Sequence, residues 1–337
     1  LWSRVVYGNG HHVTVANTNK GAYSTDGITY TASTLPTTTN SWSGLGFNGA
    51  VHVAFDFAGY CCVSSDGGVT WGSLIAMGGA TDSWGGMAAK PDGTILCVSQ
   101  DYANTALSTD NGATWTIGSL PTGGHWYGLV WDDTNGVWIT ADGTNNANKV
   151  YTSPDASTWT AYTFPSAIGY AADIDCDGAG TCIYVSGYGF GSGVTTKAMV
   201  TTNGGASWTA ITMPASQNWC SVRYGGGQWK AIAFGYADAA TSTDSGASWT
   251  LDATLTIADW FQLGFGNNVF SATGLSSSYA NQALIQTFTV PSSGVTVAIT
   301  GSRSTSKAGT MTASATVNVA LTGSRTTTKS GTVSPRT

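Results

Sequence analysis

All 18 acidic residues of this 337-residue chain are aspartates, because the sequence contains no glutamate. Two carboxylates that face each other across a sugar can hydrolyse a glycosidic bond, one as the acid and the other as base or nucleophile. A secreted glycoside hydrolase that uses two Asp is therefore one hypothesis. Six aspartates fall in segments that the repeat pattern below assigns to connecting loops: Asp56, Asp82, Asp101, Asp142, Asp238 and Asp259.

Metal and thiol chemistry has weaker support. Asp173, Asp175 and Asp177 alternate before a glycine, as at the start of a calcium loop, but the distal glutamate of such loops is absent. No cofactor or metal is expected, and calcium at these carboxylates is the alternative. Cys176 and Cys182 flank a turn sequence, so they are expected to face each other across a hairpin, as a disulfide or as two buried thiols. The four histidines are dispersed and match no catalytic motif.

The elements that must position these residues are β-strands. Only 9% of the residues are charged, while the chain contains 45 Gly, 14 Trp and 14 Tyr. Exposed helix faces need Glu, Lys and Arg, whereas abundant Gly, Thr, Trp and Tyr favour strands and turns. The net charge of −6 gives no reason to expect nucleic-acid binding. No apolar run reaches the ~18 residues that span a bilayer, so no membrane insertion is expected.

A motif of the type Ser-Thr-Asp-X-Gly-X-Thr-Trp recurs six times, and its closing aromatics lie 41, 44, 44, 49 and 41 residues apart. A period in the forties is typical of the blades of a β-propeller, each with four short strands. The central Asp or Asn can bond turn amides locally, and the Gly allows positive φ, so these residues are expected to be structural. They are Asp26, Asp66, Asp110, Asp155, Asn203 and Asp244.

A second motif alternates with the first. An aromatic residue opens a strand, a turn of Gly, Asn or Asp follows, and an apolar strand returns, which is a hairpin pattern. This motif occurs seven times and predicts seven four-stranded blades over residues 1–290. The last blade lacks the Asp turn, so its outer strand is the least defined. The openers, expected to pack between blades, are Trp2, Trp42, Trp84, Trp126, Tyr170, Trp219 and Trp260.

The repeated Asp motif resembles the Asp-box, or BNR, repeat of sialidase-like propellers, which include both enzymes and non-enzymatic proteins. The resemblance covers residues 1 to about 290 and implies the fold and the turn role of the Asp side chains. A sialidase site would also need three Arg and a Tyr–Glu nucleophile pair. Residues 1–290 contain only two arginines, Arg4 and Arg223, and the chain contains no Glu. Sialidase chemistry is therefore disfavoured.

The face opposite the Asp turns is expected to bind ligand. Aromatic faces among short polar side chains suit sugar rings, which stack through C–H groups while their hydroxyls form hydrogen bonds. Loops are also where binding residues concentrate. The loop aromatics that could contact a ligand are Phe57, Tyr60, Tyr102, Tyr188, Phe190, Tyr236 and Tyr279.

Residues 291–337 follow a different pattern. They contain two Ser/Thr/Gly-rich repeats with a period of 22 residues, beginning at Val297 and Val319. Residues 295–337 carry five of the 12 basic residues and no acid. A segment of this length is too short to form a good hydrophobic core of its own. The repeats resemble those of bacteriophage tail and virion structural proteins, which implies attachment or oligomerisation.

Taken together, these features predict an all-β propeller that serves as a recognition module, extracellular or on a virion surface. The expected partners are a cell-surface glycan or receptor and, through the repeats, virion or surface-assembly proteins, with a homo-oligomer as a further possibility. The module is expected to be non-catalytic. The two-Asp hydrolase and an architectural decoration protein without a ligand are the alternatives.

Overall fold

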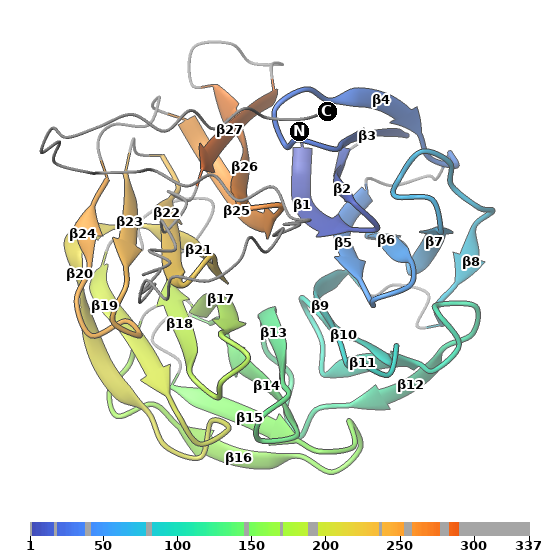
Figure 1. Ribbon diagram of the computed structural model, residues 1–337. Coiled ribbons are helices and arrows are strands. Elements are labelled where there is room, and N and C mark those ends of the chain that lie inside the picture. Colours follow the sequence, from blue (N-terminus) through green and yellow to red (C-terminus); the bar gives the residue numbers. More distant parts are fainter. Residues whose placement is uncertain are drawn as a thin grey trace, which may run out of the picture. The chain divides into compact units, whose positions relative to one another are not determined.

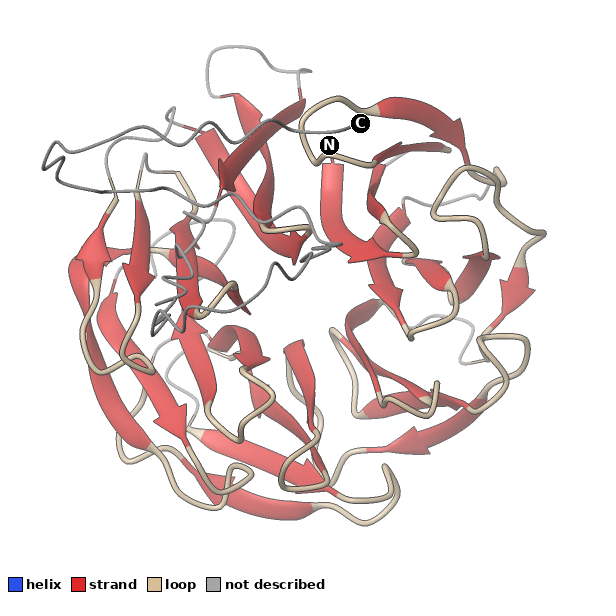
Figure 2. Cartoon of the chain, viewed as in Figure 1, coloured by secondary structure: helices blue, strands red, loops and turns tan. Residues whose placement is uncertain are grey.

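The computed structural model describes residues 2–16, 19–37, 42–78, 83–144, 148–168, 171–187, 195–235, 238–252, 258–276 and 283–289. The chain divides into two units, Leu1–Val290 and Pro291–Thr337, and all of the described residues belong to the first. Strands joined by turns and loops make up this part (Figure 2). Within it, no helix is both long and apolar enough to traverse a bilayer.

The strands form seven antiparallel sheets in chain order, of which six have four strands. Blade 1 comprises β1 (Trp2–Gly8), β2 (His11–Ala16), β3 (Lys20–Ser24) and β4 (Thr31–Thr34). Blade 2 comprises β5 (Trp42–Phe47), β6 (His52–Asp56), β7 (Tyr60–Ser64) and β8 (Ile75–Ala76). Blade 3 comprises β9 (Trp84–Ala89), β10 (Ile95–Ser99), β11 (Asn104–Ser108) and β12 (Thr116–Ser119).

The second half of the propeller repeats this order. Blade 4 comprises β13 (Trp126–Asp132), β14 (Val137–Asp142), β15 (Lys149–Ser153) and β16 (Thr160–Thr163). Blade 5 comprises β17 (Ala171–Cys176), β18 (Cys182–Ser186), β19 (Thr195–Thr201) and β20 (Thr209–Gln217). Blade 6 comprises β21 (Trp219–Gly225), β22 (Gln228–Ala233), β23 (Ala239–Ser242) and β24 (Thr250–Leu251). The last sheet contains β25 (Ala258–Gly266), β26 (Val269–Ser276) and β27 (Ala283–Thr289).

The predicted β-propeller of four-stranded antiparallel blades is confirmed, but the blade count is corrected from seven to six. The sheet that opens at Trp260 has three strands in the described part of the chain. The reason is visible in the sequence, because residues 260–289 lack the Asp turn that joins the third and fourth strands of each complete blade. The first strand of every sheet lies innermost, around one axis (Figure 1). The three-stranded sheet packs between β21 and β1, and so closes the ring.

Opener tryptophans fill the space between sheets near the axis. Trp42, Trp84, Trp126, Trp219 and Trp260 are all 0–1% exposed. Burying an aromatic side chain removes a large apolar area from water, so one opener in each sheet ties neighbouring inner strands together. The side chain of Trp2, and Tyr170, lie outside the described residues.

A β-bulge follows the opener position in all seven inner strands, where the pairing with the second strand shifts register. In two blades the side chain of the residue inserted by the bulge donates a hydrogen bond to the second strand. Ser43 Oγ lies 3.2 Å from the Phe55 carbonyl oxygen, and Cys220 Sγ lies 3.5 Å from that of Ile232. Bulges change the direction of side chains and often occur next to functional sites.

The Asp turns are held by their own side chains. In blade 3, the Ser108 hydroxyl donates to Asp110 (2.9 Å), which also accepts the N–H (2.8 Å) and the hydroxyl (2.6 Å) of Thr114. Turn N–H donors lower the pKa of the equivalent Asp26 to about 2. The corresponding residues bond turn amides in the other five blades: Asp26, Asp66, Asp155, Asn203 and Asp244. These contacts satisfy turn amides locally, as expected of Asx turns.

On the side that carries the Asp turns, here called the Asp-turn face, polar side chains connect one sheet to the next. The donors sit in turns between the first and second strands, and the acceptors are main-chain carbonyls of the following sheet. These contacts are Asn9 to Ala50 (2.9 Å), Asn48 to Gly93 (2.9 Å), Thr134 to Gly178 (3.2 Å) and Asn267 to Thr25 (3.4 Å). The last of these bonds joins the C-terminal sheet to blade 1.

Candidate functional site

The opposite side of the propeller, here called the loop face, exposes aromatic side chains. Phe57 and Tyr60 flank the turn between β6 and β7, and Tyr102 follows β10. Their exposed fractions are 39%, 40% and 50%. Exposed aromatic rings of this kind are available to stack on a ligand. The other four predicted ligand contacts, Tyr188, Phe190, Tyr236 and Tyr279, lie outside the described residues.

Next to Tyr102, four side chains from blades 3 and 4 meet. Asp101 Oδ1 lies 3.4 Å from Nδ1 of His125, and both side chains are more than 40% exposed. The His125 ring stacks on Tyr127, with centroids 6.3 Å apart and planes within 8°. The Gln100 side-chain amide donates to the Tyr127 hydroxyl (3.3 Å). We call Gln100, Asp101, Tyr102, His125 and Tyr127 the loop-face cluster.

Sequence reasoning found only Asp101 and Tyr102 of this cluster. The signal that it missed is positional, because His125 and Tyr127 flank the opener Trp126. Any residue next to an opener sits where the connection from the previous blade enters the innermost strand. The side chains of Gln100 and Tyr127 come together because blades 3 and 4 are neighbours.

Other candidate catalytic aspartates serve as caps or have polar partners. Asp56 is fully buried and accepts the N–H groups of Ala58 (2.9 Å) and Tyr60 (2.8 Å). Asp142 is 8% exposed and accepts the N–H of Thr144 at 2.9 Å. Asp238 accepts the side-chain amide of Gln217. Asp82 and the side chain of Asp259 lie outside the described residues.

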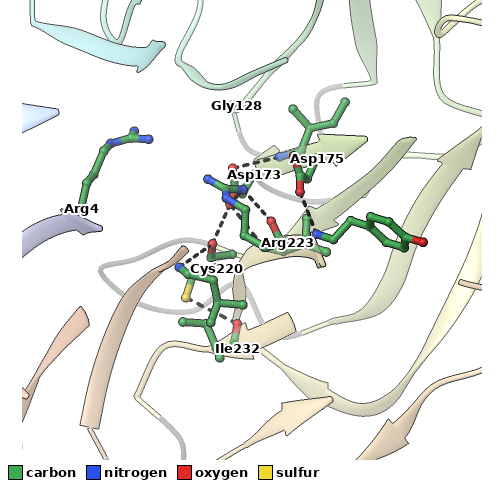
Figure 3. A network of polar contacts seen from close by, with 12 residues as sticks. Arg4, Gly128, Asp173, Asp175, Cys220, Arg223 and Ile232 are labelled. Atoms are coloured by element: carbon green, nitrogen blue, oxygen red, sulfur yellow. Dashed lines mark hydrogen bonds and ion pairs between the residues drawn. The ribbon is translucent and has the colours of Figure 1, made fainter. Parts of the chain in front are cut away.

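Closer to the axis, charged side chains join blades 5 and 6 (Figure 3). Asp173 Oδ2 accepts hydrogen bonds from the Ser221 hydroxyl (2.6 Å), the Val222 N–H (3.2 Å) and Arg223 Nη1 (2.7 Å). Asp175, two residues along the same strand, accepts the N–H of Tyr224 at 2.7 Å. The inner edge of β21 has no neighbouring strand in its own sheet, so these carboxylates satisfy N–H groups that a strand would otherwise bond.

Arg4 approaches the same region from β1. It is half-buried, and its guanidinium donates to the main-chain carbonyl of Gly85 on β9. Strand β5 lies between β1 and β9 in the order of blades, so Arg4 bridges two sheets that are not neighbours. Gly85 sits one residue after the opener Trp84, at the end of β9 that meets the loop face.

Burial sets the charge state of this group. It raises the pKa of Asp175 to about 6, although Arg223 and the Tyr224 amide act in the opposite direction. Burial also lowers the pKa of Arg4 to about 10. Burial opposes the charge of Arg223 too, but Asp173 and Asp175 outweigh it and raise that pKa. The environment therefore disfavours charge at Asp175 and at Arg4.

The raised pKa of Asp175 predicts a pH-dependent stability. Between about pH 4 and pH 6 the folded protein binds a proton at Asp175 that the unfolded chain releases, so the free energy of unfolding falls as the pH rises. Asp175→Asn removes this penalty. We expect the variant to be more stable than wild type by about 1 kcal/mol at pH 7, after allowance for partial solvent exposure, and equal to it near pH 4. Urea unfolding followed by tryptophan fluorescence at several pH values measures the difference, and a constant offset between the two proteins would contradict the assignment.

The predicted calcium ligands do not converge. Asp173 and Asp175 are bonded to β21, whereas Asp177 caps its own hairpin turn through the N–H groups of Ala179 (2.8 Å) and Thr181 (3.0 Å). In the described part of the chain, the one set of three ligand-type side chains with donor atoms within 4.8 Å is Asp132, Cys176 and Cys182. These two cysteines, the predicted hairpin pair, are joined by a disulfide.

Sheets of four antiparallel strands around one axis define a β-propeller protein. Its candidate site, the loop-face cluster, lies on the loop face. No protein-family model matches the sequence, and no curated protein matches it either. The Asp-box and virion-protein resemblances therefore remain predictions.

Solved structures with the same fold do match. A structure of streptogramin B lyase is 13% identical with a TM-score of 0.66, over 82% of this chain and 90% of that one. Virginiamycin B lyase from Staphylococcus aureus, with quinupristin, is 14% identical with a TM-score of 0.68, over 81% and 92%. YCF48 bound to D1 peptide is 14% identical with a TM-score of 0.65, over 86% and 92%. At such identities the likeness establishes the fold alone.

Proposed function

We propose that this propeller is a non-catalytic recognition module that binds a carbohydrate on its loop face, over the loop-face cluster. The observation that carries the proposal is the contrast between the two faces. Polar turns on the Asp-turn face bond to the next sheet, so their hydrogen-bonding groups are occupied within the protein. The loop face leaves the aromatic rings of Phe57, Tyr60 and Tyr102 exposed, whereas the large apolar side chains exposed in the Asp turns, Ile28 and Val69, are aliphatic.

The chemistry of the loop-face cluster suits a polyhydroxylated ligand. Tyr102 provides a half-exposed ring for stacking on a sugar face. His125 and Asp101 offer donors and acceptors that water reaches, since both are more than 40% exposed. Gln100 holds Tyr127 through its hydroxyl, which restricts that ring before a ligand arrives. Restricting side chains in this way reduces the entropy lost on binding.

Binding has better support than hydrolysis by two aspartates. Asp56 and Asp142 cap turns, and Asp238 is bonded to Gln217. A carboxylate that holds a turn would have to give up those bonds before it could act on a substrate. The solved neighbours include a lyase and a protein bound to a peptide, so the fold itself serves both catalysis and binding.

The proposed location and partners of the module rest on features of the sequence. We propose an extracellular or virion-surface setting, in which residues 291–337 attach the propeller to a larger assembly. The support is the 22-residue repeat and its five basic residues, set against 18 acids in the rest of the chain. Opposite net charges would favour contacts between the repeats and acidic surfaces.

A glycan array probed with the full chain tests the carbohydrate proposal. We expect a defined set of glycans to bind, and Tyr102→Ala to weaken the best one by about tenfold, as truncation of an aromatic anchor typically does. His125→Ala should weaken it less. Ile28→Ala is the matched control, since Ile28 is 63% exposed in an Asp turn on the other face. No binding to any glycan, or equal loss in the control, would refute the proposal.

A further inference from the structure

Arg4 differs from Arg223 and Lys230, two cations of the described residues that pair with carboxylates. Arg223 and Lys230 each have a carboxylate oxygen at 2.7 Å. Among the described residues, no carboxylate lies within ion-pair distance of Arg4, and the hydrogen bond found for its guanidinium goes to the carbonyl of Gly85. A half-buried charge without a counter-charge is costly, so such groups are often found where a ligand supplies the missing charge.

The nearest charged groups do not neutralise the positive charge of Arg4. Asp173 and Arg223 are the charged groups that act on it most strongly, one attracting and the other repelling. These two are already paired with each other at 2.7 Å, so their effects on Arg4 largely cancel. Cys97 also lies near, but burial holds its pKa well above the ordinary value and keeps the thiol neutral. Burial then dominates and lowers the pKa of Arg4.

We propose that Arg4, with Arg223 on the other side, forms an anion-binding site near the propeller axis for a compact oxyanion. Figure 3 shows Arg4 extending from β1 while Asp173 and Arg223 come from β17 and β21. Arginine suits this role because its planar donors bind two oxygens of a carboxylate, sulfate or phosphate group at once.

Arg4 is partly exposed, so solvent reaches part of its side chain although the glycines beside it are closely packed. The bonded carbonyl belongs to Gly85, which is followed by a second glycine, Gly86. Gln100 of the loop-face cluster lies against Gly85, because a Cβ there would come within 3.2 Å of the Gln100 Cβ. The anion site is therefore next to the proposed carbohydrate surface, but it does not depend on it, since a free ion is enough to occupy it.

Titration with inorganic phosphate at constant ionic strength tests the site directly. The full chain has five arginines, so their Nε–H signals are few enough to follow by NMR. We expect the Arg4 signal to shift with saturation. Arg4→Gln should weaken phosphate binding by about tenfold, the value of one charge-assisted hydrogen bond. Lys149→Gln removes an exposed cation on β15 and should change nothing.

A second variant keeps the test valid if Arg4→Gln folds poorly. Asp173→Asn removes the carboxylate that faces both arginines, and it should strengthen phosphate binding by about threefold or more if the arginines hold the anion. If Arg4 had only a structural role, Asp173→Asn would not strengthen phosphate binding. The proposal is wrong if wild type shows no saturable shift at Arg4, or if Asp173→Asn leaves phosphate affinity unchanged.

The source of the anion is settled by a pair of glycans that differ only in one carboxylate. Preference for the acidic member, lost in Arg4→Gln, would assign the oxyanion to the ligand. Equal binding of the two glycans, with phosphate binding intact, would assign the site to a free ion. Loss of glycan binding alone would contradict the carbohydrate proposal and leave the anion site standing.

Discussion

Gly85→Ala should lower the free energy of unfolding by about 3 kcal/mol or more, which is at the upper end for overpacking a well-packed site. A methyl group at this position would lie 2.2 Å from the carbonyl oxygen of Trp126. That oxygen belongs to β13, the inner strand of the next blade, and not to a side chain that could rotate away. The two inner strands pack directly on one another, so blades 3 and 4 would have to separate. Urea unfolding followed by tryptophan fluorescence measures the loss.

Gly123→Ala is the matched control for this change. Gly123 lies in the connection that leads into β13, and a Cβ there would meet nothing within 4 Å. Its φ is not positive, so alanine introduces no backbone strain at this site. The control should therefore stay within about 0.5 kcal/mol of wild type. If Gly85→Ala lowered the free energy of unfolding as little as the control does, that result would contradict the close packing of the two inner strands.

Asp252→Ala should be destabilising to a similar degree, by about 3 to 5 kcal/mol, because it leaves a buried lysine without its carboxylate. Lys230 is 5% exposed, and its ammonium group lies 2.7 Å from Asp252 and 2.8 Å from the hydroxyl of Thr241. Asp252 also accepts the Thr241 hydroxyl at 2.7 Å, so side chains from β22, from β23 and from the residue that follows β24 meet in this cluster. Thermal unfolding detects the change as a fall in Tm.

A double variant distinguishes the effect of breaking the ion pair from that of a general loss of packing. Lys230→Met combined with Asp252→Ala removes both charges, and the methionine keeps most of the lysine side-chain volume. We expect the double variant to recover most of the stability lost in Asp252→Ala, because replacing both members of a buried pair is often nearly neutral. A double variant as unstable as the single one would show that packing, and not the unpaired charge, dominates.

The Asp turns illustrate what local sequence can predict. Asp110 bonds the amide and the hydroxyl of Thr114, four residues further on, so the whole interaction is contained in one short motif. The spacing of the six motifs also predicts the blades, because each blade repeats the same order of strands and turns. The blade count was less secure, since the sheet opened by Trp260 contains no Asp turn and has three strands in the described part of the chain.

The candidate site shows where local sequence stops being informative. His125 and Asp101 are 24 positions apart and belong to different blades, and neither has a sequence signature that points to the other. The contact between Arg4 and Gly85 spans 81 positions and passes over a whole blade. The acidic stretch at Asp173 to Asp177 suggested a metal loop, but neighbouring strands engage two of its carboxylates.

The sequence by itself determined the strands, the Asp turns, the propeller class and the absence of a sialidase residue set. These properties depend on composition and on interactions within about eight residues, which a repeat preserves in every copy. Only the tertiary structure decided which side chains share the loop face and which charges meet near the axis. That outcome depends on how consecutive sheets pack, and packing joins residues from different repeats whose identities vary independently of the motif.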